Sequence, residues 1–226
     1  VVVTLTQGME FDLRTFPRED SGSLGALKAQ ADLERYTYLV AGCVGEFWTE
    51  IGMAHVPALR LWDARAMSAT GVRFGKALQY TNVLRDIPRD LRIGRCYLPE
   101  EKLGAVDLKP KDLLSPLNAV RARSVLCEEL RVALGHYEQA QAYILATPRR
   151  CVALRLATLW PVLIGLATLA KLARNADWLH PERPSKVSRA WVYAMLVLST
   201  LGVWSNAFVL LWIWSLKRKV EAACES

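Results

Sequence analysis

Two aspartates four residues apart lie near the end of a predicted helix. Asp86 and Asp90 fall in the stretch YTNVLRDIPRD, and this spacing places both carboxylates on one face of a helix. Asn82 and Gln79 extend the same face by one and two turns. Paired carboxylates are hard oxygen ligands that suit Mg²⁺, which proteins commonly hold with one or two carboxylates and the phosphates of a substrate. The pattern therefore predicts a magnesium site at Asp86 and Asp90.

The same spacing, taken alone, is more typical of a solvated helix surface with ion pairs along the helix. Arg85, Arg89 and Arg92 on the neighbouring face would supply such pairs, although they could also meet phosphate oxygens. Two features favour a site. The amides continue the stripe of carboxylates, and Pro88 lies between the two aspartates, where it should bend the helix.

A second candidate element, ERYTYLVAGCVGEFW, carries small residues on one side of an otherwise bulky helix. These residues are Ala41, Gly42 and Gly45, and glycine inside a helix costs about 1 kcal/mol relative to alanine. Two interpretations stay open: close packing of two helices, or space for a long apolar ligand. Tyr36 lies one turn before Val40, so its hydroxyl could point into the same cavity.

The elements that must position these residues are predicted to be helices in an all-α fold. The chain has 226 residues and is 52% hydrophobic, which excludes a disordered protein. Apolar residues recur at helical spacing, and no stretch alternates as a strand would. The predicted helices are Val1–Thr15, Ala26–Ile51, Asp63–Arg92, Leu117–Ala146 and Cys151–Ala173, with loops at 16–25, 94–110 and 175–188.

An uncharged segment near the C-terminus is long enough to cross a membrane. Residues 192–214 hold no charged side chain, and a helix of that length reaches roughly 35 Å, against ~30 Å for the bilayer core. Aromatic residues flank both ends and three basic residues follow, whereas Ser199 and Asn206 support the alternative of a buried core helix. We predict a helical domain (1–189), a single-pass transmembrane anchor (190–216) and a basic tail (217–226).

Cysteine usage and charge restrict the compartment and the partners. The five cysteines and three histidines are scattered, so a zinc site and a disulfide framework are not expected. This pattern favours a reducing compartment, with the domain on the cytoplasmic side of its membrane. The net charge of +7 comes without a nucleic-acid motif. We therefore expect a diphosphate substrate and a membrane surface as partners, no nucleic acid, and a monomer.

Three motifs in the expected order resemble the squalene/phytoene synthase family. GKALQYTNVLRDIPRDLRIGRCYLPEE is similar to the second aspartate-rich motif of that family with its trailing G-R-x-Y-L-P loop. YTYLVAGCVG is similar to the tyrosine-containing motif, and QGMEFDL resembles the G-M-x-x-D-L helix. The likeness covers about Gly8 to Pro99. Beyond it, PSKVSRAWVY is similar to a basic segment ahead of the anchor in squalene synthases.

The resemblance implies a class I isoprenoid (trans-prenyl) synthase helical bundle, here partial, and the head-to-head joining of two prenyl diphosphates. Asp86 and Asp90 would be catalytic and would bind Mg²⁺, while Tyr36 would assist proton removal or diphosphate departure. The implied substrate-binding residues are Val40, Ala41, Gly45, Gln79, Asn82, Arg85 and Arg95, and Arg85 and Lys186 would touch NADPH phosphates.

The predicted anchor favours the squalene synthase type, which joins two farnesyl diphosphates and reduces the product with NADPH. Phytoene synthase and presqualene diphosphate synthase are the alternatives. The family's first aspartate-rich motif, D-x-x-[DE]-D, does not occur upstream of Asp86, so the chain resembles an N-terminally truncated member and is expected to be inactive by itself. A hypothesis of another class is a non-catalytic membrane-anchored remnant or lipid-binding scaffold, which would tolerate Asp86→Asn.

Overall fold

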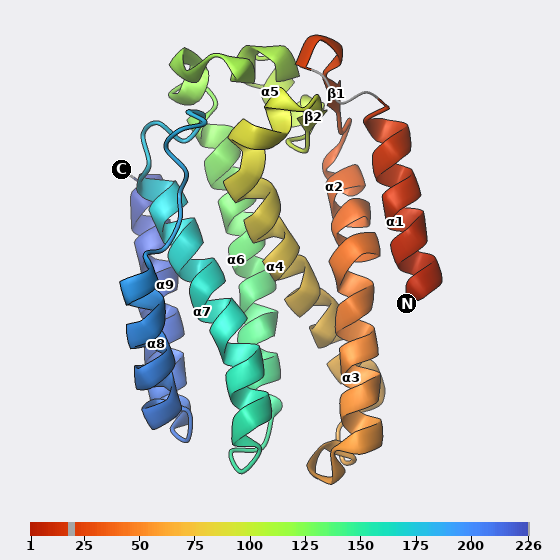
Figure 1. The fold of residues 1–226 in the computed structure, drawn as a ribbon, viewed down its shortest axis with the longest axis vertical. Helices are drawn as coiled ribbons and strands as arrows, with labels where there is room; N and C mark the ends of the chain where they lie inside the picture. The colour runs from red at the N-terminus through yellow and green to blue at the C-terminus, as the bar shows by residue number, and fades with distance from the viewer. Residues whose placement is uncertain (18–20, 226) are drawn as a thin grey trace.

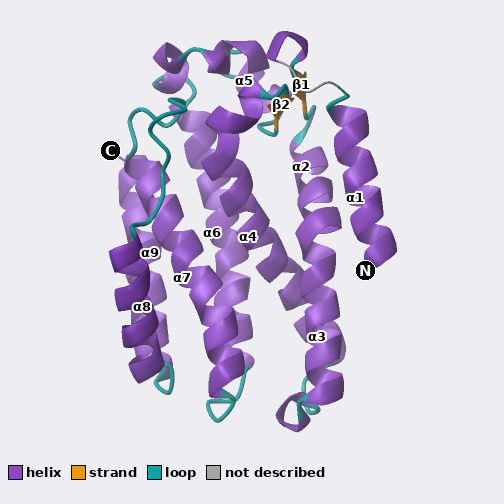
Figure 2. Cartoon of the chain, in the orientation of Figure 1, coloured by secondary structure: helices purple, strands orange, loops and turns teal. Residues whose placement is uncertain are grey.

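Helices make up nearly all regular structure in the computed structural model, which describes residues 1–17 and 21–225 (Figures 1 and 2). Long helices run up and down beside one another, and short turns gather at one end of the bundle (Figure 1). The predicted loop 16–25 includes residues 18–20, which lie outside the described part. The elements are α1 (Val2–Thr15), η1 (Ser21–Ser23), β1 (Gly25–Ala26), α2 (Gln30–Thr37), η2 (Tyr38–Gly42), α3 (Cys43–His55), η3 (Pro57–Leu59), α4 (Ala64–Arg92), β2 (Arg95–Cys96), α5 (Glu100–Gly104), η4 (Pro110–Leu114), η5 (Pro116–Ala119), α6 (Arg123–Ala146), α7 (Val152–Arg174), α8 (Arg189–Gly202) and α9 (Asn206–Glu225).

The predicted all-α fold is confirmed, and α4, like α1, starts within one residue of its predicted start and ends at its predicted end. Its N-cap is Asp63, whose side chain accepts a hydrogen bond from the Ala66 amide at 3.0 Å. The helix continues across Pro88 to Arg92. The helix predicted from Ala26 instead begins at Gln30 and contains a π-helical segment, η2. The helix predicted from Leu117 begins at Arg123, because two proline-led 3₁₀ turns precede it.

A short parallel pair of strands joins two segments that are distant in the sequence. β1 pairs with β2 in the register Gly25 to Arg95 (Figure 2). The Gly25 amide donates to the Gly94 carbonyl at 2.9 Å, and the Leu27 amide donates to the Cys96 carbonyl at 3.1 Å. Two residues per strand are too few to give an alternating pattern, so the sequence did not predict this pair. The pairing holds the segment after α4 against the segment before α2.

The predicted single helix over 190–216 is wrong, because the chain reverses direction within it. α8 and α9 form an antiparallel hairpin that packs against α7 (Figure 1). Ser199 Oγ accepts a hydrogen bond from Trp160 Nε1 at 2.9 Å. Asn206 Oδ1 accepts one from Arg155 Nη2, also at 2.9 Å. These polar side chains satisfy donors on α7, which favours the hairpin over one uninterrupted apolar helix.

α7 is the core helix that the sequence predicts. Among the described residues it is the one helix long and apolar enough to cross a membrane, and 61% of its most apolar window is buried inside the bundle. Arg155, which is fully buried, donates to the Thr147 carbonyl at 2.6 Å as well as to Asn206. A buried and partnered arginine is expected in a protein interior and costly in lipid, so its place agrees with a core helix.

Candidate active site

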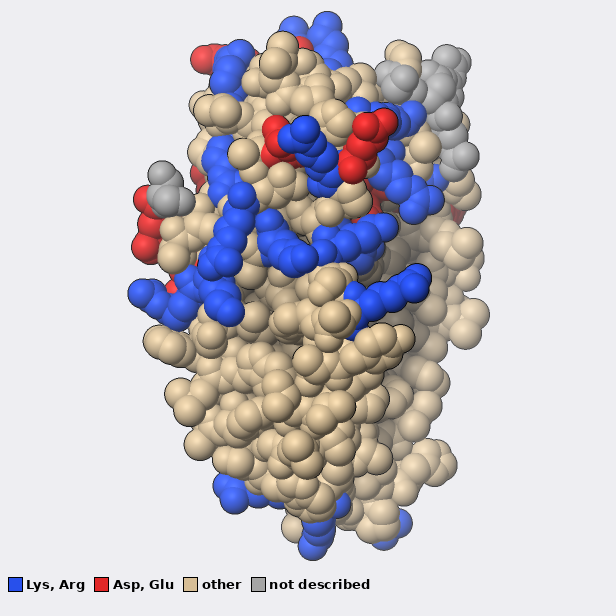
Figure 3. Space-filling view, turned by 60° about the vertical axis from the view of Figure 1, so that its left-hand side comes forward, with Lys and Arg blue, Asp and Glu red and all other residues tan. Residues whose placement is uncertain are grey.

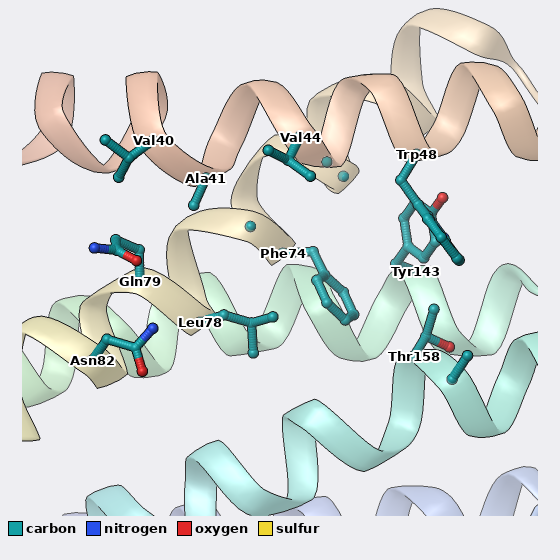
Figure 4. A pocket seen from close by; sticks show the side chains of 14 residues that line it. Val40, Ala41, Val44, Trp48, Phe74, Leu78, Gln79, Asn82, Tyr143 and Thr158 are labelled. Carbon is teal, nitrogen blue, oxygen red and sulfur yellow. The ribbon is translucent and has the colours of Figure 1, made fainter. Parts of the chain in front are cut away.

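A cavity of about 400 Å³ lies between α3, α4 and α7, and its volume is within the range of small-molecule pockets (Figure 4). The polar side chains of Gln79 and Asn82 lie together at one end, while Trp48 and Tyr143 lie at the other (Figure 4). The remaining wall is mostly apolar. The lining residues include five of the substrate-binding residues that the resemblance implies, Val40, Ala41, Gly45, Gln79 and Asn82, and also Val44, Phe74, Leu78, Ala157 and Thr158.

The two aspartates continue the face of α4 that carries the amides. Asp86 is one turn beyond Asn82, about 6 Å along the helix axis, and Asp90 is one turn further. The Asp86 carboxylate accepts a hydrogen bond from Arg85 Nε at 2.8 Å and one from Arg85 Nη2 at 2.5 Å. Because Asp86 occupies its guanidinium, Arg85 would have to give up these hydrogen bonds to bind a ligand. An apolar pocket therefore leads to a carboxylate pair along one helix.

The carboxyl group of Asp90 is partly buried and has a raised pKa. Burial raises its pKa to about 6, and the charge of Asp86 adds to this rise, while Arg95 and Arg89 oppose it. A cation bound between Asp86 and Asp90 would lower the pKa of Asp90 again and favour its charged form. Among the described residues no three His, Cys, Asp or Glu side chains form a closed metal cage. Two carboxylates nevertheless fit Mg²⁺, which retains waters and takes substrate phosphates as further ligands.

We expect the affinity for Mg²⁺ to increase as the pH rises from about 5 to about 7, because Asp90 loses its proton near pH 6. The folded-state pKa is above the unfolded value of about 3.9, so this group favours folding below that value and loses the contribution as the pH passes 6. Calorimetric titration of Mg²⁺ at several pH values measures the effect. Asp90→Asn should flatten the pH dependence; a wild-type affinity that does not change over this range would contradict the assignment.

A chain of polar contacts connects Tyr36 with α1. The Tyr36 hydroxyl donates to the Tyr97 hydroxyl at 3.4 Å, and the two rings stack with centroids 4.9 Å apart. The Tyr97 hydroxyl donates to Asp12 Oδ1 at 2.6 Å, and Arg95 Nη1 lies 2.7 Å from Asp12 Oδ2. Arg95, predicted as a diphosphate ligand, is therefore paired with a carboxylate. Asp12 and Tyr97 belong to the motifs read in the sequence, but no role was assigned to either.

Tyr36 is a neutral phenol at this position. Burial raises its pKa, the hydrogen bond with Tyr97 opposes this, and the charges of Asp12 and Asp90 add to the rise. The influence of Asp90 shows that the tyrosine motif and the aspartate pair meet at the same end of the bundle. A phenol with a raised pKa suits hydrogen-bond donation to an anion better than proton abstraction.

The contacts of the small residue Gly45 test the two interpretations, close helix packing and space for an apolar ligand. Gly45 crosses Gly71 of α4 so closely that an added Cβ would overlap the Gly71 carbonyl oxygen. A Cβ on Gly71 would lie 2.6 Å from the Gly45 carbonyl oxygen, which is also too close. Close helix packing is therefore confirmed. Gly45 and Ala41 line the cavity as well, so the same crossing forms its wall.

A buried polar cluster, absent from the predicted site, fixes α2 against α4 and α6. Glu34 Oε1 accepts a hydrogen bond from the Tyr80 hydroxyl at 2.6 Å, and His136 Nε2 lies 3.3 Å from the same oxygen. Lys76 pairs with the other carboxylate oxygen. Burial by itself raises the pKa of Glu34, but these hydrogen bonds and the Lys76 charge outweigh it and hold the pKa well below its ordinary value. The cluster sets the position of the helix that bears Tyr36.

Lys186 is not brought to Arg85. It lies in the loop between α7 and α8, where its carbonyl accepts a hydrogen bond from Lys171 Nζ at 2.9 Å. No contact joins Lys186 to Arg85 in residues 1–17 and 21–225, and Arg85 is engaged with Asp86. A joint contact of these two side chains with NADPH phosphates stays a prediction.

The helical bundle and the carboxylate pair beside an apolar pocket define an isoprenoid synthase fold. A family profile described as squalene/phytoene synthase matches residues 1–191, and the chain belongs to that family. It is 43% identical over 112 residues to the bifunctional lycopene cyclase/phytoene synthase of Arthroderma gypseum, covering 49% of this chain and 18% of that protein. It is 34% identical over 155 residues to the phytoene synthase of Pseudescherichia vulneris, covering 69% and 47%.

Solved structures agree with the fold. The complex of TcSQS with the ligand E5700 superposes with a TM-score of 0.67 at 20% identity, over 89% of this chain and 63% of that one. At this identity the likeness concerns the fold alone. The chain spans less than a fifth of the Arthroderma gypseum protein and about half of the Pseudescherichia vulneris enzyme.

Proposed function

We propose that this chain forms the prenyl-diphosphate-binding part of an enzyme that joins two prenyl diphosphates head to head, and that the enzyme is of the phytoene synthase type. The observation that carries the proposal is one face of α4, on which Gln79 and Asn82 line an apolar cavity and Asp86 follows one turn further along the helix. A prenyl diphosphate has the matching shape and polarity: a long apolar tail and an anionic head that binds through Mg²⁺.

Each group has a distinct task in this proposal. Asp86 and Asp90 would hold Mg²⁺, which when bound neutralises the charge of the leaving diphosphate. The Tyr36 phenol would turn its single O–H proton from the Tyr97 hydroxyl to that diphosphate, while Asp12 holds Tyr97 in place. The apolar cavity keeps water from an allylic cation and places its chain beside the second substrate.

Two observations favour the phytoene type over the squalene type. The relatives with 43% and 34% identity are named as phytoene synthases. The single-pass anchor that pointed to a squalene synthase is replaced by a packed hairpin. We therefore propose geranylgeranyl diphosphate as the substrate and do not include a reductive step.

We expect this chain by itself to bind the substrate with little turnover, because its described residues bring together one aspartate pair for two diphosphates. Turnover is therefore tested in a hybrid in which this chain replaces the matching segment of the Pseudescherichia vulneris enzyme. With geranylgeranyl diphosphate and Mg²⁺, without NADPH, the hybrid should form phytoene. The unmodified enzyme is the positive control. A folded hybrid that makes no product, or that makes squalene from farnesyl diphosphate only with NADPH, would contradict the proposal.

A further inference from the structure

The α8–α9 hairpin leaves a large apolar surface without a partner. Its exposed residues, here called the hairpin face, are each at least 52% accessible: Tyr193, Val197, Leu198, Leu201, Trp204, Leu211 and Trp214. The opposite sides of the two helices, including Met195 and Ile213, are buried against the bundle. On the corresponding side of the molecule, a broad surface without charged side chains lies below the middle, and basic side chains appear again only at its lower edge (Figure 3). An exposed apolar surface of this kind marks an interaction site.

The reversal of the chain collects the positive charges of this region at one end of the hairpin face. Residues 183–220 contain six Lys and Arg and no Asp or Glu. In a single spanning helix they would lie on opposite sides of a membrane. In the hairpin, the start of α8 and the end of α9 lie side by side, so both groups reach the same end, and Figure 3 shows basic side chains gathered in a band above the uncharged surface. The six are Arg183, Lys186, Arg189, Lys217, Arg218 and Lys219. Three of them pair with carboxylates: Arg183 with Asp177, Lys217 with Glu138 and Arg218 with Glu221.

The tip of the hairpin suits a medium without water. The Val203 amide donates to the Ser199 carbonyl at 2.8 Å, and the Ser205 amide donates to the Gly202 carbonyl at 3.0 Å. Hydrocarbon tolerates backbone groups only when they are bonded internally in this way. From the start of α8 to the tip the hairpin extends about 20 Å, which exceeds the ~15 Å thickness of the hydrocarbon of one leaflet. Trp204 at the tip would therefore lie in the hydrocarbon of one leaflet, and the basic residues at the other end would lie at the level of its phosphates.

We propose that the hairpin face binds an anionic phospholipid bilayer, with Trp204 and its apolar neighbours immersed in one leaflet and the basic band against the lipid phosphates. Charge complementarity selects this partner: the band is positive and the cytoplasmic leaflet is negative. The chain would lie on the membrane from one side and would not cross it. This attachment is independent of the proposed function, because the aspartate pair lies on α4 and not on the hairpin.

Flotation of the full chain with lipid vesicles tests the proposal. One set of vesicles is pure phosphatidylcholine and the other contains about 30% phosphatidylserine. We expect binding to the anionic set, weakened by high salt. The double variant Val197→Asp, Leu201→Asp should reduce the bound fraction at least tenfold, and Arg189→Gln with Lys219→Gln should reduce it selectively on anionic vesicles, by about fivefold per lost cation. All four positions are exposed, and Lys219 borders a surface hollow as well. The variants should therefore fold, which their circular dichroism spectra will show.

Leu117→Asp is the control, since Leu117 is 89% exposed but lies in η5 and is not part of the hairpin face. It should bind vesicles as the wild type does. Equal binding by the Val197/Leu201 variant and the wild type would overturn the proposal. A second result would also overturn it: the wild type does not bind vesicles but forms a stable dimer, and the Val197/Leu201 variant is a monomer. The hairpin face would then be the contact between two copies of the chain.

Discussion

Replacing Asp86 with asparagine is expected to weaken the Mg²⁺-dependent binding of a prenyl diphosphate about 100-fold. Asn has the same shape but removes one of the two negative charges that hold the cation, and breaking such a charged pair costs a few kcal/mol. The release of Arg85, which Asp86 now engages, would leave it available to the diphosphate directly. We therefore expect a residual affinity that no longer depends on Mg²⁺. Calorimetry with the unreactive geranylgeranyl thiodiphosphate, with and without Mg²⁺, measures both parts.

Asp63→Asn is the matched control for this measurement. It makes the same chemical change on the same helix, and because Asn also caps helices well, the cap at the start of α4 should persist. Its Mg²⁺-dependent affinity should equal that of the wild type. If Asp86→Asn also binds as tightly as the wild type and with the same Mg²⁺ dependence, the aspartate pair is not the metal site. The reading as a non-catalytic lipid-binding scaffold would then gain support.

Gly45→Ala is expected to lower the free energy of unfolding by about 2 kcal/mol and the melting temperature by about 6 °C. Helix propensity alone would stabilise the variant by about 1 kcal/mol, because alanine is the better helix former. The added methyl group, however, would overlap the Gly71 carbonyl oxygen at the crossing of α3 and α4, and backbone atoms can yield only if the two helices separate. Separation also widens the cavity wall, so binding of the prenyl chain should weaken as well.

Gly104→Ala provides a comparison with the opposite sign. Gly104 is the last residue of α5, and nothing lies within 4 Å of the Cβ that the substitution would add. The variant should be as stable as the wild type or more stable by up to about 1 kcal/mol. Urea denaturation of both variants at one pH measures the difference. A Gly45→Ala protein as stable as Gly104→Ala would show that the helix crossing is not tight.

The sequence predicted the parts of the site that lie on single helices. Asp86, Asn82 and Gln79 share one face of α4 because helical periodicity alone places them there, and the fold leaves that face beside the cavity. The π-helical segment and the two-residue strand pair were beyond reach, since neither has a periodicity that a sequence can show over so few residues. Arg95 was assigned to the substrate from its motif, but its carboxylate partner is 83 positions away in the sequence.

The C-terminal segment shows the limit most clearly. Its composition fits a spanning helix and a packed hairpin equally well, and Ser199 and Asn206 decide between them only when Trp160 and Arg155 stand opposite. By itself the sequence determined the helical class and the aspartate stripe, because both follow from local periodicity, while the channel residues were implied by the resemblance of a motif. Only the tertiary structure decided the pKa of Asp90, the orientation of Tyr36 by Tyr97 and Asp12, and the hairpin, because these depend on burial and on charges brought together by distant parts of the chain.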